Sequence, residues 1–545
     1  MNGNGKQLNK IITYTVPSSE TYIEKDANIY TNNLINLSEA EIIEKALSLH
    51  SQGDIFEASK YYQLFINQGF IDVRVFSNYG VICQKRGEIS KAIKLYKKSI
   101  QLFPKRSECY SNLGYIYKEQ KNLEEAEKYT RKAIEINPRF ANAFLNLGNI
   151  MKDKGQLIDA EKYTRKAINL NPSGAECYLN LANILIDMGK LDEAIIYIQK
   201  TIDLDPKLIK PYYILSTLPM IKNSGDWQDH IFSDRILLNK GSKDKIDIYF
   251  ARANILHKKK QFDLSSQYLI MANNLKLTLY PSNLDYRLHK SRTLMKESLK
   301  KDISDSCDSE IPKSIFIVGM PRSGSTLLES ILSMNPDIND LGEVNIFEDS
   351  FLEWKRLKSE NRNINLDEVY LKKLNILANN SSIITNKWLY NYQYVGIILS
   401  HIPNAFVIHC FRNPLDNILS IFRAHFSKGN EYSSSLIDCA KVYLDQEKKM
   451  NIYKKQYPSK IYSLNYDFLV TNPYTEIRSL ISWLGWDWND SYESPHLNSR
   501  SVSTASRVQV RSPINSKSIG GWKNYKSLLE PIIDIFAKTD TSNIN

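Results

Sequence analysis

A short segment of the chain combines the residue types that hold a phosphate group. It reads Gly-Met-Pro-Arg-Ser-Gly-Ser-Thr over 319–326, between an apolar, β-branched run at 314–320 and a helical pattern at 327–334. A strand that turns through glycine into a helix points successive backbone N–H groups and the helix N-terminus at one place, which favours an anion. The segment therefore predicts an anion site whose positive charge comes from Arg322.

The spacing of this loop equals that of the G-x-x-x-x-G-K-[ST] loop of nucleoside triphosphatases, but Ser325 stands where the lysine is required. That lysine binds the β- and γ-phosphates beside Mg²⁺. Its absence argues against hydrolysis of ATP or GTP. A nucleotide whose terminal group carries less charge, such as a sulfuryl group on phosphate, could be held by Arg322 without a metal.

A second segment of the same kind lies further along the chain. A buried strand is predicted at 404–411, and it leads into Arg412 and then into a helix that carries Ser420. Arginine at a strand end and serine in the following helix can converge on one phosphate. Two anion sites fit a nucleotide with a 5′ chain and a separate 3′-phosphate, which is 3′-phosphoadenosine 5′-phosphosulfate (PAPS).

The composition limits the kind of protein that this chain can be. Its 545 residues include 71 Lys and Arg against 60 Asp and Glu, a formal net charge of +11, and 42% of the residues are hydrophobic. This apolar content supports folded cores and excludes a mainly disordered chain. Six cysteines without a C-x-x-C pair exclude a disulfide scaffold and disfavour a cysteine-based zinc site.

The charge and the apolar runs also indicate partners and location. No helix-turn-helix, zinc-finger or RNA-recognition signature accompanies the positive charge, so a nucleic-acid partner is not expected. The first residues lack the apolar centre of a signal peptide. No stretch reaches the ~18–20 apolar residues that span a bilayer. We therefore expect a cytoplasmic protein without a membrane span.

The first half of the chain carries an internal repeat of 34 residues. Small residues recur at this interval, at Ala46, Gly80, Gly114, Gly148 and Ala182. Alanine follows each of them by twelve residues, and proline closes four of the units at 104, 138, 172 and 206. In such a unit two antiparallel helices pack closely where the small residue meets the alanine, and proline ends the second helix.

This pattern resembles the tetratricopeptide repeat and implies an α-solenoid of five repeats over 39–208, after an N-terminal segment 1–38. A degenerate helical pair within 209–311 would form a bridge to the rest of the chain. The concave groove of such a solenoid usually binds extended polypeptide, so a protein or peptide partner is expected. The alternative is that the repeats form a homodimer or brace the neighbouring domain.

The segments IFIVGMPRSGSTLLESIL, VIHCFRNPLDNILSIF and SIGGWKNY together resemble the PAPS-dependent sulfotransferase superfamily. The pattern is most similar to tyrosylprotein sulfotransferases and to bacterial tetratricopeptide-repeat sulfotransferases. The resemblance implies a three-layer α/β domain over 312–545 with a mainly parallel sheet. It also implies PAPS as the donor of a sulfuryl group and a hydroxyl acceptor, with tyrosine, sugar, lipid and small phenol left open.

The resemblance assigns residues to the nucleotide. The 5′-phosphosulfate would be bound by the loop residues Arg322, Ser323, Gly324, Ser325 and Thr326. The 3′-phosphate would be bound by Arg412 and Ser420, and Tyr466 matches a tyrosine near the nucleotide.

The segment 503–523 resembles the C-terminal lid over the nucleotide. Four of its residues are candidate contacts, namely Ser506, Arg511, Ser518 and Lys523. The family often has a basic residue just before the tryptophan of this lid, where this chain has Gly521. Lys517 or Lys523 would have to replace it.

For catalysis, the resemblance assigns Glu343 as the base that takes the proton of the acceptor hydroxyl. Lys387, after the next predicted strand, would stabilise the transferring group together with Arg322. His425 is an alternative base. A P-loop kinase and a repeat scaffold with an inactive transferase domain are the alternative functions, and intact Arg322, Glu343 and Lys387 argue against the second.

Overall fold

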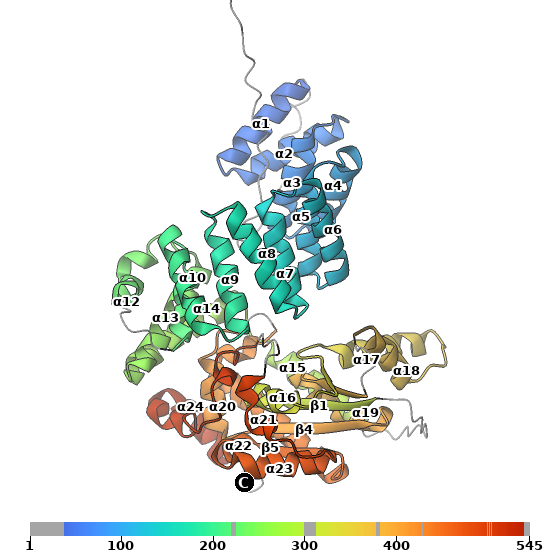
Figure 1. Ribbon diagram of the computed structural model, residues 1–545, viewed down its shortest axis with the longest axis vertical. Helices are drawn as coiled ribbons and strands as arrows, with labels where there is room; N and C mark the ends of the chain where they lie inside the picture. Colours follow the sequence, from blue (N-terminus) through green and yellow to red (C-terminus); the bar gives the residue numbers. More distant parts are fainter. Residues whose placement is uncertain are drawn as a thin grey trace, which may run out of the picture. The chain divides into compact units, whose positions relative to one another are not determined.

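The computed structural model describes residues 37–219, 225–298, 312–377, 382–426, 429–498, 500, 502 and 504–538. Its contacts divide the chain, drawn in Figure 1, into two compact units. The first comprises Met1–Leu185 and Asp192–Asp205, and the second Ile186–Leu191 and Pro206–Asn545. We describe each unit by itself. Of the predicted N-terminal segment, residues 1–36 lie outside the described residues, as do 220–224 and 299–311 of the predicted bridge.

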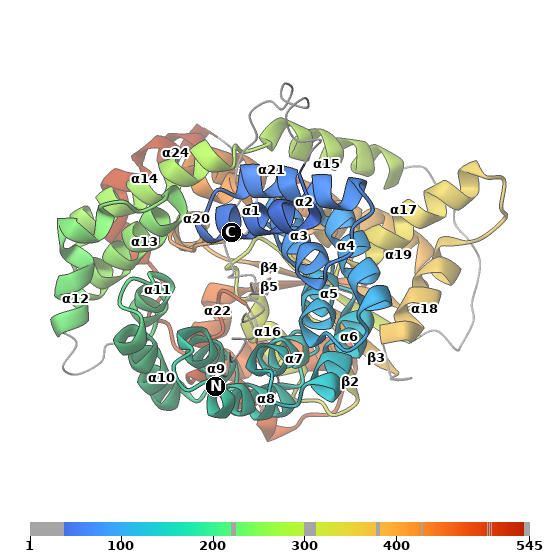
Figure 2. The same cartoon turned by 90° about the horizontal axis from the view of Figure 1, so that it is seen from above.

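The first unit is built from consecutive helix pairs, which follow a curved path in Figure 2. The pairs are α1 (Glu39–Ser51) with α2 (Ile55–Asn67), α3 (Val73–Lys85) with α4 (Ile89–Leu102), α5 (Ser107–Glu119) with α6 (Leu123–Ile136), and α7 (Ala141–Asp153) with α8 (Leu157–Leu170). The helices α9 (Ala175–Asp187) and α10 (Leu191–Leu204) follow. The predicted α-solenoid is confirmed.

Close packing between the helices of a pair explains the recurring glycines. A Cβ atom on Gly114 would lie 2.2 Å from Thr130 Oγ1 and 3.0 Å from the carbonyl oxygen of Ala126. Gly148 meets Thr164 and Ala160 in the same way, at 2.3 and 3.2 Å. The predicted contact between the small residue and the alanine of the second helix is therefore confirmed.

We expect Gly114→Ala to destabilise the repeat unit by about 1–2 kcal/mol, because the overpacking cost exceeds the gain in helix propensity. Chemical denaturation followed by circular dichroism measures this loss. Removing the facing hydroxyl with Thr130→Ala in the same chain should restore most of the stability. A Gly114→Ala chain more stable than the wild type would contradict the packing argument.

The second unit begins with helices and continues into the α/β domain. These helices are α11 (Lys210–Thr217), α12 (Gly225–Phe232), α13 (Ser242–Lys258), α14 (Phe262–Leu279) and α15 (Leu284–Ser298). The pair α13 and α14 corresponds to the predicted degenerate repeat. Its buried Phe250 and Leu269 share one core with Ile418 and Tyr525, which lie much later in the chain. The helical bridge is thus packed against the α/β domain.

The sheet has five parallel strands in the order β2-β3-β1-β4-β5. They are β1 (Lys313–Gly319), β2 (Ile338–Asp340), β3 (Ile383–Asn386), β4 (Ala405–Phe411) and β5 (Ile461–Asn465). Every strand pair is parallel, so the prediction of a mainly parallel sheet is confirmed. The two predicted buried strands, 314–320 and 404–411, correspond to β1 and β4.

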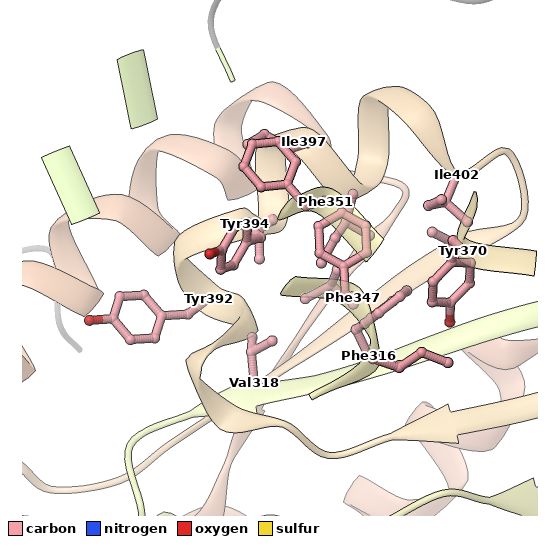
Figure 3. Packing of buried hydrophobic residues seen from close by; sticks show 14 of the residues in the cluster. Phe316, Val318, Phe347, Phe351, Tyr370, Tyr392, Tyr394, Ile397 and Ile402 are labelled. Carbon is pink, nitrogen blue, oxygen red and sulfur yellow. The ribbon is translucent and has the colours of Figure 1, made fainter. Parts of the chain in front are cut away.

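Helices cover both faces of this sheet and form three layers. Phe316 and Val318 of β1 belong to a core with Phe347 of α17 (Ile346–Ser359) and Tyr370 of α18 (Leu366–Leu377), shown in Figure 3. The intervening Ile317 packs on the other face, with residues of α16 (Ser325–Leu332) and α23 (Pro473–Leu484). This alternation along one strand is the signature of a sheet buried on both sides.

The strand order places the candidate site. From β1 the chain crosses through α16 to β2 at one edge, whereas from β4 it passes through α20 (Pro414–Phe422) and α21 (Leu436–Gln456) to β5 at the other edge. The connections therefore diverge at the carboxyl ends of the neighbouring strands β1 and β4. In open α/β sheets, ligands bind at such a switch point. Within the described ranges, the chain has no helix long and apolar enough to cross a membrane.

Candidate active site

The loop after β1 has a backbone that only glycine allows at two positions. Gly319 has a φ of +151°, and a Cβ atom there would lie 2.4 Å from the carbonyl oxygen of Cys410. Gly324 has a φ of +94°, and a Cβ atom there would lie 2.3 Å from Cδ2 of Tyr466. The loop is therefore pressed against the end of β4 and against the Tyr466 ring. Helix α16 begins directly after it, at Ser325.

Arg322 lies at the centre of the loop and joins three segments of the chain. Its own φ is +67°, a left-handed value that is unusual outside glycine and is often found at functional sites. The guanidinium donates from Nε to Ser420 Oγ (3.1 Å), from Nη1 to Ser506 Oγ (2.5 Å) and from Nη2 to Gln509 Oε1 (2.7 Å). Three predicted site residues, Arg322, Ser420 and Ser506, are thus brought together, with Gln509 in addition.

Arg412 lies at the end of β4 and is 6% exposed. Its Nη2 donates to the Ser518 carbonyl oxygen (2.9 Å), and its guanidinium stacks 4.7 Å above the centre of the Tyr466 ring. The Tyr466 hydroxyl lies 3.0 Å from Ser518 Oγ. The nearest carboxylate oxygens, on Asp416 and Asp467, are 4.0 Å away. Three predicted contacts, Arg412, Tyr466 and Ser518, therefore lie side by side.

The arginines of the loop and of β4 form a cluster with a third, Arg423, which sequence reasoning did not assign to the site. Burial, together with the charges of Arg412 and Arg423, lowers the pKa of Arg322 to about 10. Among the described residues, neither Arg322 nor Arg423 has a carboxylate within 4.0 Å. Arg423 is three residues after Ser420, on the same side of the helix, which is the spacing that could have revealed it.

This cluster fits a phosphorylated ligand. Like charges held close together and away from water are costly unless an anion neutralises them. Two donors also lack a partner within the described part of the chain, namely Ser323 Oγ and Arg412 Nε. Both side chains are buried, and an unmade hydrogen bond at such a site costs free energy. The residues present therefore suit the phosphate groups of a nucleotide donor.

The predicted base and the predicted lysine form an ion pair. Lys387 Nζ lies 2.9 Å from Glu343 Oε1, and the Lys387 backbone N–H donates to the Gly342 carbonyl oxygen (2.9 Å). Gly342 has a φ of +64°, the turn that carries the chain from β2 to Glu343. The lysine is 1% exposed, whereas the Glu343 side chain is 48% exposed. A half-exposed carboxylate can meet an acceptor hydroxyl, and a buried cation is held in one place beside it.

A second carboxylate, Glu329, also contacts the lysine and was missed by sequence reasoning. Its Oε2 lies 3.1 Å from Lys387 Nζ, and its side chain is 1% exposed. Burial opposes the charge on Lys387, but the attraction of Glu329 and Glu343 outweighs it, so the pKa of Lys387 is raised. Glu329 lies inside the apolar pattern of the helix after the loop, where a buried carboxylate is unexpected. This glutamate in an apolar pattern is the sequence feature that could have revealed the second carboxylate.

The remaining predicted residues have other surroundings. Arg511 donates to the carbonyl oxygens of Asp187 (2.7 Å), Asn498 and Arg500 (2.6 Å), so its guanidinium supports the backbone. Lys523 is exposed. Thr326 Oγ1 lies 3.4 Å from Thr504 Oγ1. As nucleotide contacts, these residues stay predictions.

The alternative base, His425, packs against the helical bridge. Its Nε2 lies 3.0 Å from Asp247 Oδ1, and its ring stacks on Phe250 with centroids 4.8 Å apart. Burial lowers the pKa of His425 despite the neighbouring carboxylate. Glu343 is more exposed than His425 and pairs with Lys387, so the geometry favours Glu343 over His425 as the base.

The lid docks on a residue that sequence reasoning did not single out. Both carboxylate oxygens of Asp416, in the first turn of α20, accept backbone N–H groups, from Gly520 (2.7 Å) and from Trp522 (2.9 Å). A Cβ atom on Gly521 would lie 3.7 Å from the same carboxylate. The backbone at Gly521 therefore runs directly over Asp416. This docking explains how the lid is held without a basic side chain at that position.

By its fold and site, the second unit contains an α/β domain with an arginine cluster at a strand–loop–helix turn, suited to an anion, and a carboxylate–lysine pair beside the same helix. A model described as "Sulfotransferase family" matches residues 312–490. Models of the tetratricopeptide repeat match 107–140 and 175–208, and another matches 129–162. The chain therefore carries tetratricopeptide repeats followed by a sulfotransferase family domain.

Several known proteins are similar to parts of the chain. An uncharacterized protein of Aquifex aeolicus is 30% identical over 312 residues, 52% of this chain and 40% of its own length. A Caenorhabditis briggsae protein named as a candidate protein-tyrosine sulfotransferase is 26% identical and covers 39% of this chain and 82% of its own length. A protein-tyrosine sulfotransferase of Drosophila melanogaster is 24% identical and covers 40% and 48%. The chain thus spans less than half of the first and third relatives.

Among solved structures, a thermophilic tetratricopeptide-repeat protein of Thermus thermophilus matches with 21% identity and a TM-score of 0.30. The match covers 33% of this chain and 98% of that protein. A TM-score of this size adds nothing to the fold described above.

Proposed function

We propose that this chain transfers a sulfuryl group from PAPS to a hydroxyl acceptor, with tyrosine on a protein or peptide as the first acceptor to test. The observation that carries the proposal is the cluster of Arg322, Arg412 and Arg423 at the loop. Among the described residues, Arg322 and Arg423 have no carboxylate within 4.0 Å, and the carboxylates nearest to Arg412 are 4.0 Å away. Ser323 Oγ and Arg412 Nε have no hydrogen-bond partner there. The matching family and the similarity to protein-tyrosine sulfotransferases support the same activity.

Different residues of the site would bind the 5′-phosphosulfate and the 3′-phosphate of the donor. Arg322, the loop N–H groups and Ser323 would hold the 5′-phosphosulfate, and Arg412 with Ser420 the 3′-phosphate. When bound, the donor supplies an activated sulfuryl group on a phosphate oxygen. Glu343 takes the proton of the acceptor hydroxyl while the acceptor oxygen bonds to sulfur and the bond from sulfur to phosphate breaks. Lys387 and Arg322 neutralise the charge that develops on the transferring group and on the leaving phosphate.

Binding of the product nucleotide gives a direct test. Adenosine 3′,5′-bisphosphate should raise the melting temperature of the full chain without Mg²⁺, because the arginine cluster supplies the positive charge. ATP with Mg²⁺ should stabilise it less, since the loop lacks the lysine of a kinase. A chain stabilised by ATP with Mg²⁺ and not by the bisphosphate would instead support a P-loop kinase.

Transfer of a radioactive sulfuryl group can identify the class of acceptor. The chain is incubated with ³⁵S-PAPS and a cell lysate, and the labelled products are identified. Label on tyrosine residues supports a protein acceptor, and label on sugar, lipid or small phenols assigns the acceptor to that class. A chain that binds the bisphosphate but labels nothing would favour a scaffold with an inactive transferase domain.

The first unit offers a place for the partner. We expect the concave surface of the repeats to bind a protein or peptide, as such solenoids commonly do. A version of the chain without the repeat unit should then sulfate a short acceptor as well as the full chain does, but a protein acceptor less well. A homodimer and a cytoplasmic location likewise remain predictions.

A further inference from the structure

Lys387 lies between two carboxylates of very different exposure. Its Nζ is 2.9 Å from Glu343 Oε1 and 3.1 Å from Glu329 Oε2. Glu343 is half exposed, so an acceptor hydroxyl can reach it from solvent, whereas Glu329 is 1% exposed. The second carboxylate is therefore shielded from the acceptor and cannot act as the base itself.

Glu329 is held by a further cation from a distant segment. Arg500 Nη2 donates to Glu329 Oε2 (2.6 Å), and Arg500 Nη1 pairs with Asp340 at the end of β2. The Arg500 backbone is fixed in turn by Arg511, which donates to the Arg500 carbonyl oxygen (2.6 Å). Cys410 of β4 also lies near these groups, because the charges of Lys387 and Glu329 act in opposite directions on the pKa of its thiol.

The ion pairs give this network two cations and three carboxylates. Lys387 and Arg500 face Glu329, Glu343 and Asp340, so the network has one negative charge in excess when all groups are ionised. When Glu343 accepts a proton, the network becomes neutral. Proton transfer to Glu343 therefore removes an excess charge and leaves no buried cation unpaired.

Without Glu329 the same step would be costly. Glu343 would be the only carboxylate within 4.0 Å of Lys387 among the described residues. Protonating it would leave a lysine that is 1% exposed without a counter-ion. A buried charge whose partner is removed is strongly destabilising, by several kcal/mol in measured cases. The base would resist protonation, and the transition state would rise in energy.

Resting on the proposed sulfuryl transfer, we propose that Glu329 is a positioning residue that acts as the permanent counter-ion of Lys387, so that Glu343 is free to serve as the base. Arg500 keeps Glu329 in place. The hydroxyl proton of the acceptor goes to Glu343, and Lys387 stays paired with Glu329 before and after the transfer.

The test compares Glu329→Gln with Glu447→Gln in the full chain. Glu447 is also a buried carboxylate of the second unit, but it pairs with His409 at 3.3 Å and lies outside the site. We expect Glu329→Gln to lower kcat about 100-fold, the size of effect seen when one preorganised charge is lost. Loss of the Glu329 charge also makes Glu343 harder to protonate, so the acid limb of the kcat profile should move to lower pH. Glu447→Gln should leave that limb in place.

A second readout needs no turnover. In Glu329→Gln, Glu343 would be the only carboxylate within 4.0 Å of Lys387 among the described residues, so loss of the Glu343 charge in acid would leave a buried cation without a counter-ion. The melting temperature of the ligand-free variant should therefore drop more steeply on acidification than that of the wild type. Affinity for adenosine 3′,5′-bisphosphate should be unchanged, because Glu329 contacts neither Arg322 nor Arg412.

The outcomes separate the two proposals. A wild type that transfers no sulfuryl group overturns the proposed function and the role of Glu329 with it. An active wild type with an unchanged acid limb in Glu329→Gln overturns the role of Glu329 alone, even if kcat falls. If Glu329→Gln does not fold, Glu329→Asp takes its place in the test. The shorter aspartate keeps the negative charge but holds it further from Lys387. In Glu329→Asp, a loss of kcat smaller than about 100-fold together with an acid limb shifted to lower pH supports the proposal. An unchanged kcat in this variant overturns it.

Discussion

Glu343→Gln is expected to lower the rate of sulfuryl transfer by ~10³-fold while leaving the affinity for adenosine 3′,5′-bisphosphate unchanged. Glutamine has nearly the same shape, but its amide cannot take the hydroxyl proton. Its carbonyl oxygen can still accept a hydrogen bond from Lys387 Nζ, which is 2.9 Å from the carboxylate in the wild type. The fold should survive because the side chain is half exposed.

The measurement is steady-state transfer from ³⁵S-PAPS, with bisphosphate affinity determined in parallel by calorimetry. Glu348→Gln is a matched control, because Glu348 is a nearby glutamate that pairs with Lys290 and not with Lys387. It should keep most of the activity. Wild-type turnover in Glu343→Gln would exclude Glu343 as the base and direct attention to His425.

Arg322→Ala should weaken binding of adenosine 3′,5′-bisphosphate and lower transfer by ~10²–10³-fold or more. The side chain supplies the positive charge of the loop and joins it to Ser420, Ser506 and Gln509. Its loss removes both a ligand of the 5′ group and the link between the loop and the lid. The ligand-free chain should lose little stability, because the repulsion from Arg412 and Arg423 disappears with the three hydrogen bonds.

Calorimetry and thermal unfolding of the ligand-free chain check the two parts of this prediction. Arg478→Ala serves as the control, since Arg478 is an exposed arginine that stacks on Tyr474 and Trp488. Arg322→Lys should recover part of the affinity, as it keeps the charge but not the three-way hydrogen bonding. Full affinity in Arg322→Ala would mean that the loop does not hold the nucleotide.

The elements around the loop could be predicted because each rests on local patterns. The β-branched run before Gly319 and the apolar spacing after Gly324 define a strand and a helix by themselves. The backbone geometry of the loop between them favours an anion, which is why the sequence predicts a site there. Arg412 and Ser420 followed from the same kind of junction in the second segment, and the structure brings Ser420 to Arg322 and Arg412 to the lid.

The charged groups that surround Lys387 could not be predicted from local sequence patterns. Glu329 comes from α16, Lys387 from the end of β3 and Arg500 from the segment before the lid. No spacing in the sequence relates them. They meet because β1 lies between β3 and β4 in the sheet, which brings α16 alongside the end of β3. Arg511 was assigned to the nucleotide, but its contacts are to backbone carbonyl groups.

The sequence by itself determined the repeat, the two strand–helix junctions and the residue types that bind an anion. These depend on periodicity and on the backbone preferences of neighbouring residues, which act over a few positions. Only the tertiary structure decided which charges share one buried site, and therefore that Lys387 has a second, permanent carboxylate. That depends on strand order, because ion pairs form between side chains that the sheet brings within a few ångströms, whatever their separation along the chain.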